Sequence, residues 1–434
     1  MKSLKEIAAQ LRGYDPQALS AEAVVGFLER LVEPVSGVEQ VGVFDALDRV
    51  LAQDIVSPIS VPPHDNSAMD GYAFDGLQLL DNEMLTLEAV GTALAGKAWH
   101  GMLETEQCVK IMTGAIMPAG LDTVAPQELV QDLGDGRISI PPRLLARGDN
   151  RRLKGEDLRE GAVAIRQGDR LTPAACGLVA SLGLASVTVY RRLQVAYFST
   201  GDEILSLGEA PREGAVYDSN RYTVFGLLKR LGCEVIDMGV VRDEPALLEA
   251  AFTEAAAKAD AIITSGGVSV GEADYTKAMM KKLGDVAFWK IAMRPGRPMA
   301  VGRIASTLAQ DRSGSGHAAV LFGLPGNPVA VMVTFLAFVR PTLLRMMGSR
   351  QTQPPLLKAR SVEPIRKKAG RTEYQRGIVR TAADGSLEVR ITGNQGSGVL
   401  SSMVQANGLI VLHHAQGNVA AGDQVDVMMF DGVI

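Results

Sequence analysis

The chain of 434 residues has few cysteines and few aromatic residues. Cys108, Cys176 and Cys233 lie far apart and form no CxxC pair, which argues against a disulfide framework and favours a reducing compartment. No long basic run occurs, and 44 basic against 49 acidic residues give a net charge of −5, so no nucleic-acid partner is expected. The first residues lack the apolar core of a signal peptide. We expect a cytoplasmic protein without a membrane-spanning segment.

Several catalytic motifs are also missing. There is no GxGxxG and no GxxxxGK[ST], so a dinucleotide site and a P-loop have no support. The five histidines show no HExxH spacing, and no GxSxG elbow is present. These absences argue against zinc-protease chemistry and serine hydrolysis.

What is present divides the chain into three patterns. Residues 191–347 alternate strands with helices, including a helix from Pro245 to Lys258, which predicts a mostly parallel sheet covered on both faces. The first 190 residues combine Pro and Gly punctuation with short strands and one clear helix, Ala21 to Leu31. Short alternating strands after Gly348 predict a small β-barrel or sandwich. The predicted fold class is a multi-domain α/β protein.

Two glycine-containing loops follow predicted strands of the α/β region. In the first, SGGVSVG at 265–271, missing side chains let backbone N–H groups approach a phosphate. In the second, GLPGNPV at 323–329, Asn327 is placed to cap a helix and Pro328 to occupy its first turn. Either loop alone could be a turn without a ligand. Two at the same sheet edge favour a phosphate-bearing ligand.

Charged residues surround these loops in the sequence. Glu203, Asp218, Asp243 and Asp274 follow strand ends or begin helices, where each alone could be a cap or a solvated loop residue. As a cluster beside a phosphate they favour Mg²⁺, which takes oxygens from carboxylates and phosphates together. Basic residues gather in KIAMRPGRP at 290–298, where a guanidinium fork would suit a tetrahedral oxyanion, although surface charge is the alternative.

Taken together, these stretches resemble the MoeA family, the molybdopterin molybdenumtransferases, whose relatives include the gephyrin E domain. The resemblance covers nearly the whole chain and runs through DNSAMDGYAF, MTGAIMP, GEDLREGAV, STGDEI, YDSNR, SGGVSVGEADYTK, FWKIAMRPGRP, GLPGNP, QRG and QGS. It implies insertion of molybdate into adenylated molybdopterin, with Mg²⁺ as cofactor and release of AMP. It also implies an elongated homodimer with transient contacts to the adenylyltransferase and to downstream cofactor-delivery proteins.

The resemblance further implies a division into domains. A helix in 1–38 would pack on the α/β domain, and a β-rich linker domain would combine 39–57 with 162–190. Residues 58–161 would form an inserted arm. A three-layer α/β/α molybdopterin-binding domain would span 191–347, and a C-terminal β-barrel would span 348–434.

The resemblance also assigns site residues. Catalytic positions would be Asp70, Thr113, Asp157, Glu203, Asp243 and Asp274, with Glu203, Asp243 and Asp274 as metal ligands. Adenylated molybdopterin would contact Asp218, Asn220, Ser265, Gly266, Gly267, Ser269, Lys277, Pro325, Gly326, Asn327 and Pro328. Molybdate would contact Lys290, Arg294, Arg297, Arg376 and Ser397. Asp70, Thr113 and Asp157 would reach the α/β domain of the partner subunit.

Three alternatives stay open. The likeness to the gephyrin branch would imply a scaffold role instead of an enzymatic one. The similarity of the α/β domain to that of the adenylating enzyme would imply adenylyltransferase activity. Tungstate could also take the place of molybdate as the substrate. One departure from the family matters, because relatives commonly carry lysine where this chain has Arg294 and Arg297. Arginine keeps the positive charge but cannot donate a proton as an acid.

Overall fold

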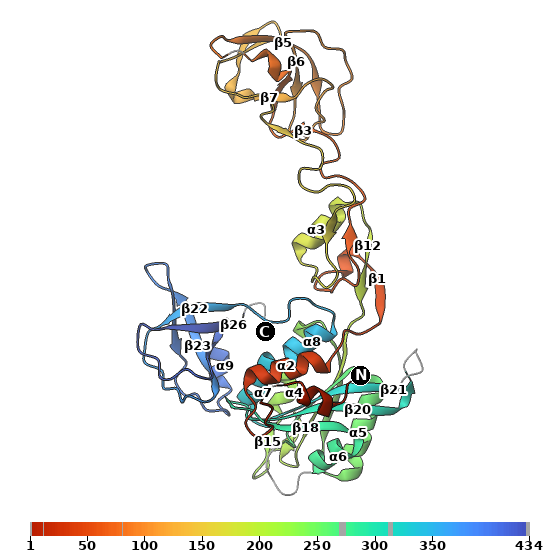
Figure 1. The fold of residues 1–434 in the computed structure, drawn as a ribbon, viewed down its shortest axis with the longest axis vertical. Helices are drawn as coiled ribbons and strands as arrows, with labels where there is room; N and C mark the ends of the chain where they lie inside the picture. The colour runs from red at the N-terminus through yellow and green to blue at the C-terminus, as the bar shows by residue number, and fades with distance from the viewer. Residues whose placement is uncertain (1, 12, 80, 269–274, 311–315, 431–434) are drawn as a thin grey trace.

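The computed structural model describes the chain apart from residues 1, 12, 80, 269–274, 311–315 and 431–434. The molecule is elongated (Figure 1). An α/β part and a small β-barrel form its base, a slender middle part rises from the base, and an arm lies at the far end. The multi-domain α/β architecture expected from the sequence is confirmed.

A six-stranded sheet forms the centre of the α/β part. Its strands follow the order β16 (Glu234–Val241), β13 (Gln194–Thr200), β17 (Ala261–Ser265), β21 (Gly316–Leu324), β20 (Pro298–Gln310) and β18 (Gly284–Lys290). The first four strands are parallel, whereas β20 and β18 run antiparallel at one edge. The sheet is therefore mostly parallel, as predicted.

Both faces of this sheet are buried. Val195 and Tyr197 of β13 belong to one core cluster with α2 (Ala21–Leu31), α4 (Ser219–Arg230) and the helices after β21. Ala196 and Phe198 belong to a second cluster with α5 (Pro245–Lys258) and α6 (Tyr275–Leu283). Successive side chains of a strand point to opposite faces, so a strand covered on both sides needs a continuous apolar run. The predicted three-layer arrangement is confirmed.

A long apolar helical segment follows β21. It consists of α7 (Pro328–Thr334), a π-helical turn, η4 (Phe335–Val339), and α8 (Arg340–Met346). Pro341 accounts for the irregular turn, because proline lacks the N–H that would continue the α-helical hydrogen bonds. By length and composition this segment could cross a membrane, which the sequence inspection did not anticipate. However, 89% of its most apolar window is buried inside the protein, as in a core helix.

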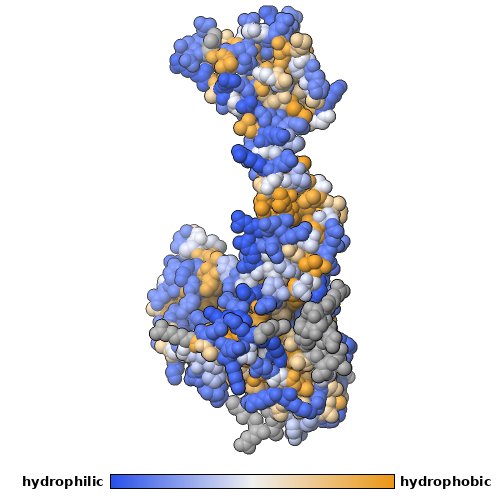
Figure 2. Space-filling view, turned by 45° about the vertical axis from the view of Figure 1, so that its right-hand side comes forward, coloured by the Kyte–Doolittle hydropathy of each residue, from blue (hydrophilic) through white to orange (hydrophobic). Residues whose placement is uncertain are grey.

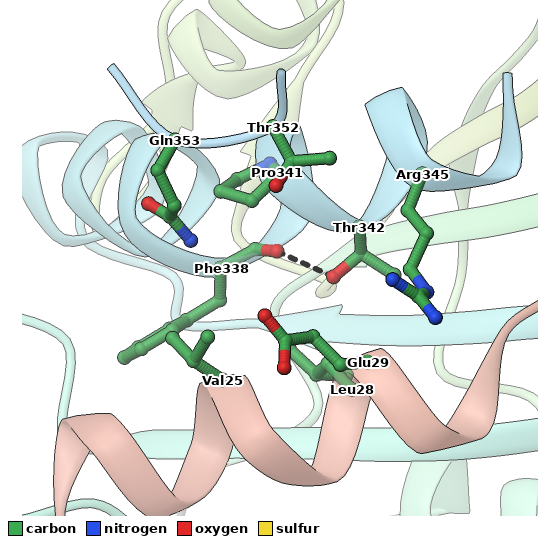
Figure 3. A pocket seen from close by; sticks show the side chains of 9 residues that line it. All are labelled: Val25, Leu28, Glu29, Phe338, Pro341, Thr342, Arg345, Thr352 and Gln353. Carbon is green, nitrogen blue, oxygen red and sulfur yellow. Dashed lines mark hydrogen bonds between the residues drawn. The ribbon is translucent and has the colours of Figure 1, made fainter. Parts of the chain in front are cut away.

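Helices α2 and α8 pack side by side at the base, and the gap between them is small (Figure 3). Its volume is about 10 Å³, room for roughly one water molecule. Phe338 and Thr342 line it, and the Thr342 hydroxyl donates to the Phe338 carbonyl at 2.7 Å. This gap is a packing feature and lies away from the glycine loops.

The C-terminal strands close into a barrel, which decides between the two predicted β architectures. The barrel strands are β22 (Leu356–Ser361), β23 (Thr372–Thr381), β24 (Leu387–Ile391), β25 (Gly408–Leu412) and β26 (Gln424–Met429). Pairing of β23 with both β24 and β25 completes the ring. A short strand of the α/β part, β19 (Met293–Arg294), pairs with β23 and joins the barrel to the base. The helix α9 (Ser401–Gln405) packs beside β23.

The middle part is built from two antiparallel strand pairs. β1 (Val38–Gly42) pairs with β12 (Ser186–Tyr190), and β2 (Ile55–Val56) pairs with β11 (Val163–Ile165). Figure 2 shows apolar side chains gathered on the surface of this part. Its exposed large apolar residues are Val38, Phe44, Leu47, Val56 and Val163.

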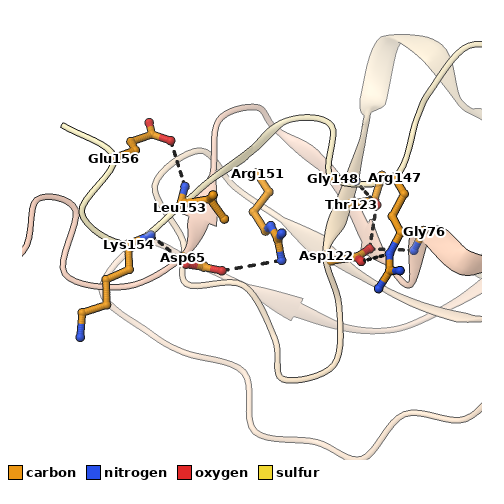
Figure 4. Close-up of polar contacts among 10 residues, drawn as sticks. All are labelled: Asp65, Gly76, Asp122, Thr123, Arg147, Gly148, Arg151, Leu153, Lys154 and Glu156. Atoms are coloured by element: carbon orange, nitrogen blue, oxygen red, sulfur yellow. Dashed lines mark hydrogen bonds and ion pairs between the residues drawn. The ribbon is translucent and has the colours of Figure 1, made fainter.

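The arm contains a six-stranded sheet. Its strands follow the order β7 (Thr123–Pro126), β4 (Gly71–Phe74), β6 (Gln107–Ile111), β5 (Leu85–Ala93), β9 (Arg137–Ile140) and β8 (Gln131–Gly134). A short pair, β3 (Asn66–Ser67) with β10 (Arg151–Arg152), lies where the chain enters and leaves. Polar contacts tie these segments together (Figure 4): Lys154 N donates to Asp65 Oδ1 at 2.8 Å, and Asp122 pairs with Arg147.

Two predictions about helices were incomplete. The N-terminal 190 residues contain α1 (Leu4–Ala9) and α3 (Pro173–Ser181) besides α2. Ser3 caps α1, and Thr172 caps α3. Both helices are short, so their apolar pattern is a weak signal in the sequence. The stretch SNRYTVFGLLKRLG at 219–232 predicts a helix, here α4, with Ser219 or Asn220 as its cap. The cap is Asp218, whose side chain accepts from Arg221 N at 3.1 Å. The remaining short elements are β14 (Ile204–Leu205), β15 (Val216–Tyr217), η1 (Val43–Asp45), η2 (Gly76–Gln78) and η3 (Gln127–Leu129).

Candidate active site

The two glycine loops meet at one edge of the central sheet. Gly266 N donates to the carbonyl of Leu324 at 3.2 Å, which joins the end of β17 to the end of β21. Gly266 and Gly267 have φ values of +91° and +64°, and a Cβ at either position would clash with Thr200 or Thr276. Only glycine fits this turn, because other residues disfavour positive φ and the neighbouring chain leaves no space.

A buried hydroxyl network lies directly beneath the first loop. Tyr197 Oη is 2.6 Å from Ser265 Oγ and 2.9 Å from Ser199 Oγ, and the two serine oxygens are 3.2 Å apart. All three side chains are at most 2% exposed. Burial raises the pKa of the Tyr197 phenol well above its usual range, so the phenol stays protonated. The network therefore fixes Ser265 at the base of the glycine turn.

The first turn of α4 reaches the second loop. Asn220 Nδ2 donates to the carbonyl of Gly326 at 2.7 Å. Asp218, the cap of the same helix, is 4% exposed. Both predicted substrate contacts are thus at the same edge as the glycine loops. A Cβ built on Gly326 meets no atom within 4 Å, so there is open space beside this loop.

The carboxylates expected to organise a metal are placed nearby only in part. Asp243 Oδ1 accepts from the Thr276 hydroxyl at 3.3 Å, and Asp243 N lies 3.4 Å from Asp202 Oδ1. Glu203 is exposed and follows Gly201, whose φ of +138° turns the chain after β13. The predicted residues Asp274 and Ser269 lie outside the described residues. Within the described part of the chain, no group of three acidic, histidine or cysteine side chains has metal-ligand spacing.

The barrel contributes a loop to the same place. The carbonyl of Ser397 accepts from Val329 N at 3.1 Å, so it satisfies an N–H group at the start of α7. Asn327 is the N-cap and Pro328 the first helical residue, as predicted, but the Asn327 side chain makes no capping hydrogen bond. The loop that contains Pro325 and Gly326 is therefore held against the barrel.

Arg376 holds this barrel loop from inside. Its side chain is 1% exposed; Nε donates to Ser402 Oγ at 2.9 Å, and Nη2 donates to the carbonyls of Gly396 (2.9 Å) and Asn394 (3.3 Å). Burial, and secondarily the neighbouring Arg294, lowers the pKa of Arg376 to about 10. The sequence predicted a direct oxyanion contact. In the structure, the Arg376 side chain also donates to the backbone carbonyls of Asn394 and Gly396, and these hydrogen bonds hold the loop 394–396 in position.

The remaining basic residues divide between two places. Arg294, in β19, lies close to Arg376 and is exposed, as is Arg297. Lys290 ends β18, and its backbone bonds to Pro16 and Leu19 of the N-terminal segment. Lys277, on α6, is different, because its ammonium lies 5.0 Å from the centre of the Phe288 ring of β18. Arg294 therefore lies on the strand that pairs with β23, and Arg376 on β23 contacts the loop that carries Ser397.

The three predicted arm residues lie far from this edge in the same chain (Figure 1). Asp70 Oδ1 accepts from both the backbone N–H and the hydroxyl of Thr113, each at 2.7 Å. These bonds, the backbone one first, lower the pKa of the Asp70 carboxyl. Asp157 is exposed near the base of the arm, with its N–H donating to the Val61 carbonyl at 3.1 Å. One chain alone does not bring the arm residues to the sheet edge.

Comparison with known proteins gives a consistent result along the chain. Residues 19–183 match the MoeA N-terminal region (domain I and II), residues 196–345 a probable molybdopterin binding domain, and residues 358–430 the MoeA C-terminal region (domain IV). A molybdopterin molybdenumtransferase of Haemophilus influenzae is 42% identical over 94% of this chain and 97% of its own length. The chain belongs to the MoeA family.

Other members of the MoeA family agree with this placement. A molybdopterin molybdenumtransferase of Nostoc is 34% identical over 90% of this chain and 88% of its own. A crystal structure of a molybdopterin biosynthesis MoeA protein from Pyrococcus horikoshii has a TM-score of 0.71 and 28% identity, covering 95% of this chain and 99% of that chain. The family resemblance inferred from the motifs is therefore confirmed. The finer domain limits and the site assignments remain predictions.

Sequence reasoning missed several residues of this MoeA-type edge. Tyr197 and Ser199 belong to the apolar strand QVAYFST, which the sequence predicts to be buried. The serine and threonine at the end of this strand were the available signal that its carboxyl end is polar. Ser402 and Thr276 were not considered, because their contacts depend on the barrel loop and on the start of α6.

Proposed function

We propose that this chain is a molybdopterin molybdenumtransferase, which inserts molybdate into adenylated molybdopterin and releases AMP. The single observation that carries the proposal is the meeting of three loops at one sheet edge. Gly266 contacts Leu324, and Val329 contacts Ser397, so a glycine turn, a helix start and a barrel loop meet at this edge. Ligands of open α/β sheets bind beyond the carboxyl ends of the strands.

The glycine turn would hold the pyrophosphate of the substrate. Ser265, Gly266 and Gly267 present a backbone without bulky side chains, and Pro325, Gly326, Asn327 and Pro328 present the start of α7. Phosphate oxygens are acceptors, and the amides of such turns are donors. Because the Gly266 amide already donates to the Leu324 carbonyl, the other amides of the turn would be the ones that bind the phosphate. Ser269 and Lys277 complete the assignment inferred from the family.

Mg²⁺ fits the donor chemistry at the neighbouring strand ends. Asp243 and Glu203 offer hard oxygen ligands, and Mg²⁺ needs only one or two carboxylates when phosphates supply the rest. These two residues, with Asp274, would hold the ion. When bound, it would neutralise charge on the phosphate that leaves with AMP. The hydroxyl of Thr276, 3.3 Å from Asp243 Oδ1, would keep the carboxylate in position.

Molybdate would bind where the barrel meets the base. Arg294 lies in β19, which pairs with the strand β23 that carries Arg376, and guanidinium groups suit a tetrahedral oxyanion. Arg294, Arg297, Lys290 and the Ser397 hydroxyl would contact the oxyanion directly. Arg376 would fix the loop that carries Ser397, with its remaining donor capacity directed to the anion.

The complete site would require a second copy of the chain. Asp70, Thr113 and Asp157 belong to the arm, which is remote from the sheet edge of its own chain (Figure 1). The apolar surface of the middle part (Figure 2) would suit a symmetric contact between two copies. We further propose a cytoplasmic homodimer that transiently contacts the adenylyltransferase and cofactor-delivery proteins, with no membrane or nucleic-acid partner.

The first test is the Asp243→Asn variant. It should lower molybdate-dependent AMP release by about 100-fold or more, the loss typical when one charged partner of a transition state is removed. The thermal unfolding curve should not change, and Asp169→Asn, in the middle part, should keep full activity. Normal AMP release by Asp243→Asn would remove this residue from the metal site.

The second test addresses the shared site. Two inactive variants, Asp70→Ala and Asp243→Asn, should restore roughly a quarter of the sites when mixed under subunit exchange, because only mixed dimers contain one intact site. Either variant alone should stay inactive after the same treatment. No recovery despite demonstrated exchange would contradict a site formed by two subunits.

A further inference from the structure

The first turn of α4 contains two buried oxygen atoms that accept no hydrogen bond. Asp218 Oδ2 and Asn220 Oδ1 are shielded from solvent, and the two residues are 4% and 7% exposed. The other polar atom of each side chain is in use. Asp218 Oδ1 accepts from Arg221 N at 3.1 Å, and Asn220 Nδ2 donates to the Gly326 carbonyl at 2.7 Å.

These contacts fix the chemical character of the two oxygens. The Asn220 amide must present its nitrogen to the Gly326 carbonyl, so its oxygen is the atom left without a donor. The Asp218 carboxylate can only accept. A buried acceptor without a donor is costly, and such groups in native proteins usually have a functional reason. The two oxygens therefore require a ligand that carries N–H or O–H donors.

Their position limits which part of the substrate this ligand can be. Asn220 contacts the loop of Gly326, beside the open space of that glycine, and Asp218 caps the same helical turn two residues earlier. A phosphate offers only acceptor oxygens near neutral pH, and it would be repelled by the Asp218 carboxylate. The phosphate is better served by the Gly266 and Gly267 turn. A ring system with donors is left for the start of α4.

The two ring systems of the substrate differ in their donors. The 2-amino-4-oxo edge of a pterin presents an amino group and a ring N–H side by side, whereas adenine presents one amino group flanked by acceptor nitrogens. Building on the proposed function, we propose that Asp218 and Asn220 accept the adjacent N–H donors of the pterin edge. The pterin then lies at the start of α4, and the AMP half points away from it.

The test compares ligands that differ in one donor. Calorimetry on the full-length protein measures the binding of pterin, of lumazine (which has a carbonyl in place of the 2-amino group), of AMP and of Mg²⁺. The unmodified protein should bind pterin about 10-fold or more tightly than lumazine, because a site built around donors rejects an analogue that lacks one. In Asp218→Asn, which places an N–H donor at the site, the preference should disappear while AMP affinity stays within about 2-fold.

The folding control is built into this variant. Asparagine caps a helix as well as aspartate, so α4 should persist and the melting curve should not change. Asp75→Asn is the matched control, because Asp75 caps η2 in the arm by accepting from Leu77 N at 3.0 Å. It should leave all four ligands unaffected.

Four results would overturn the proposal. They are equal binding of pterin and lumazine, no pterin binding at concentrations where AMP binds, a pterin preference that survives in Asp218→Asn, and an Asp218→Asn defect confined to AMP or Mg²⁺. The last result would assign the two oxygens to the nucleotide or to a cation. Molybdate-dependent AMP release by the unmodified protein tests the proposed function separately, so a failure of one is distinguishable from a failure of the other.

Discussion

The edge of the central sheet and the arm carry acidic residues in opposite states. Asp218 at the sheet edge is buried, and one of its oxygens has no donor. Asp70 in the arm is on the surface, and one oxygen accepts two hydrogen bonds from Thr113. The arm thus positions its carboxylate by itself, whereas the sheet edge leaves an acceptor for something that binds.

This difference indicates a division of labour between the two regions. A region with unsatisfied buried groups gains stability when its ligand supplies the missing partners, by the mass action of ligand binding to the folded state. A region that satisfies its own polar groups gains nothing from that ligand. The arm is therefore suited to delivering a prearranged group, and the sheet edge to recognition.

The largest expected effect comes from breaking the sheet edge at its barrel side. Arg376→Ala removes three buried hydrogen bonds from a charged donor, which should lower the free energy of unfolding by about 2–4 kcal/mol and raise the KM for molybdate. Chemical denaturation and steady-state kinetics measure both. Arg376→Lys should restore little, because an ammonium cannot form the same fork.

Arg380 provides the matched control in the same strand. Its guanidinium is largely exposed, and it pairs with Glu388 at 3.4 Å on the surface. Arg380→Ala should cost no more than about 1 kcal/mol, as exposed ion pairs do. Equal losses for the two variants would show that Arg376 does not hold the barrel loop.

The contrast between these two arginines also shows where sequence reading ends. Both lie in β23. The family resemblance singles out Arg376 in QRG, but only the closed barrel and the loop 394–398 show that its side chain is buried and holds that loop. The same holds for the Ser397 carbonyl at the start of α7, a contact between residues far apart in the chain. Long-range closure of this kind has no local signal.

Local patterns were more informative. Helix α5 begins and ends at Pro245 and Lys258 as predicted, because proline in the first turn marks the start and a long apolar repeat fills the rest. Positive φ and close packing leave only glycine possible at Gly266 and Gly267 of the first loop. The second loop was recognisable by Asn327 and Pro328, which mark the start of a helix. The cap of α4 is Asp218 rather than the predicted Ser219 or Asn220, because all three residue types are good caps and the local pattern does not choose between them.

A smaller effect is expected from loosening the hydroxyl network under the glycine turn. Tyr197→Phe removes hydrogen bonds to Ser199 and Ser265, which should cost about 1–2 kcal/mol of unfolding free energy and raise the KM for adenylated molybdopterin several-fold, with kcat nearly unchanged. Tyr190→Phe is the control, because its hydroxyl meets Gln167 on the exposed middle part at 2.8 Å. A loss of kcat alone in Tyr197→Phe would argue against a positioning role.

The smallest effect is expected in the arm. Thr113→Val removes the hydroxyl but keeps the backbone N–H, so the pKa of the Asp70 carboxyl should rise part of the way toward its ordinary value. A depressed folded-state pKa stabilises the protein above the unfolded-state pKa, and this contribution is lost as the pH falls through the folded-state value. The variant should therefore be slightly less stable than the unmodified protein at neutral pH, and the difference should disappear as the pH falls below the folded-state pKa. Carboxyl NMR titration measures the pKa directly, and Thr113→Ser should keep it low. If Thr113→Val left the titration unchanged, the arm would not position its acid through Thr113, and the contrast with the sheet edge would lose its basis.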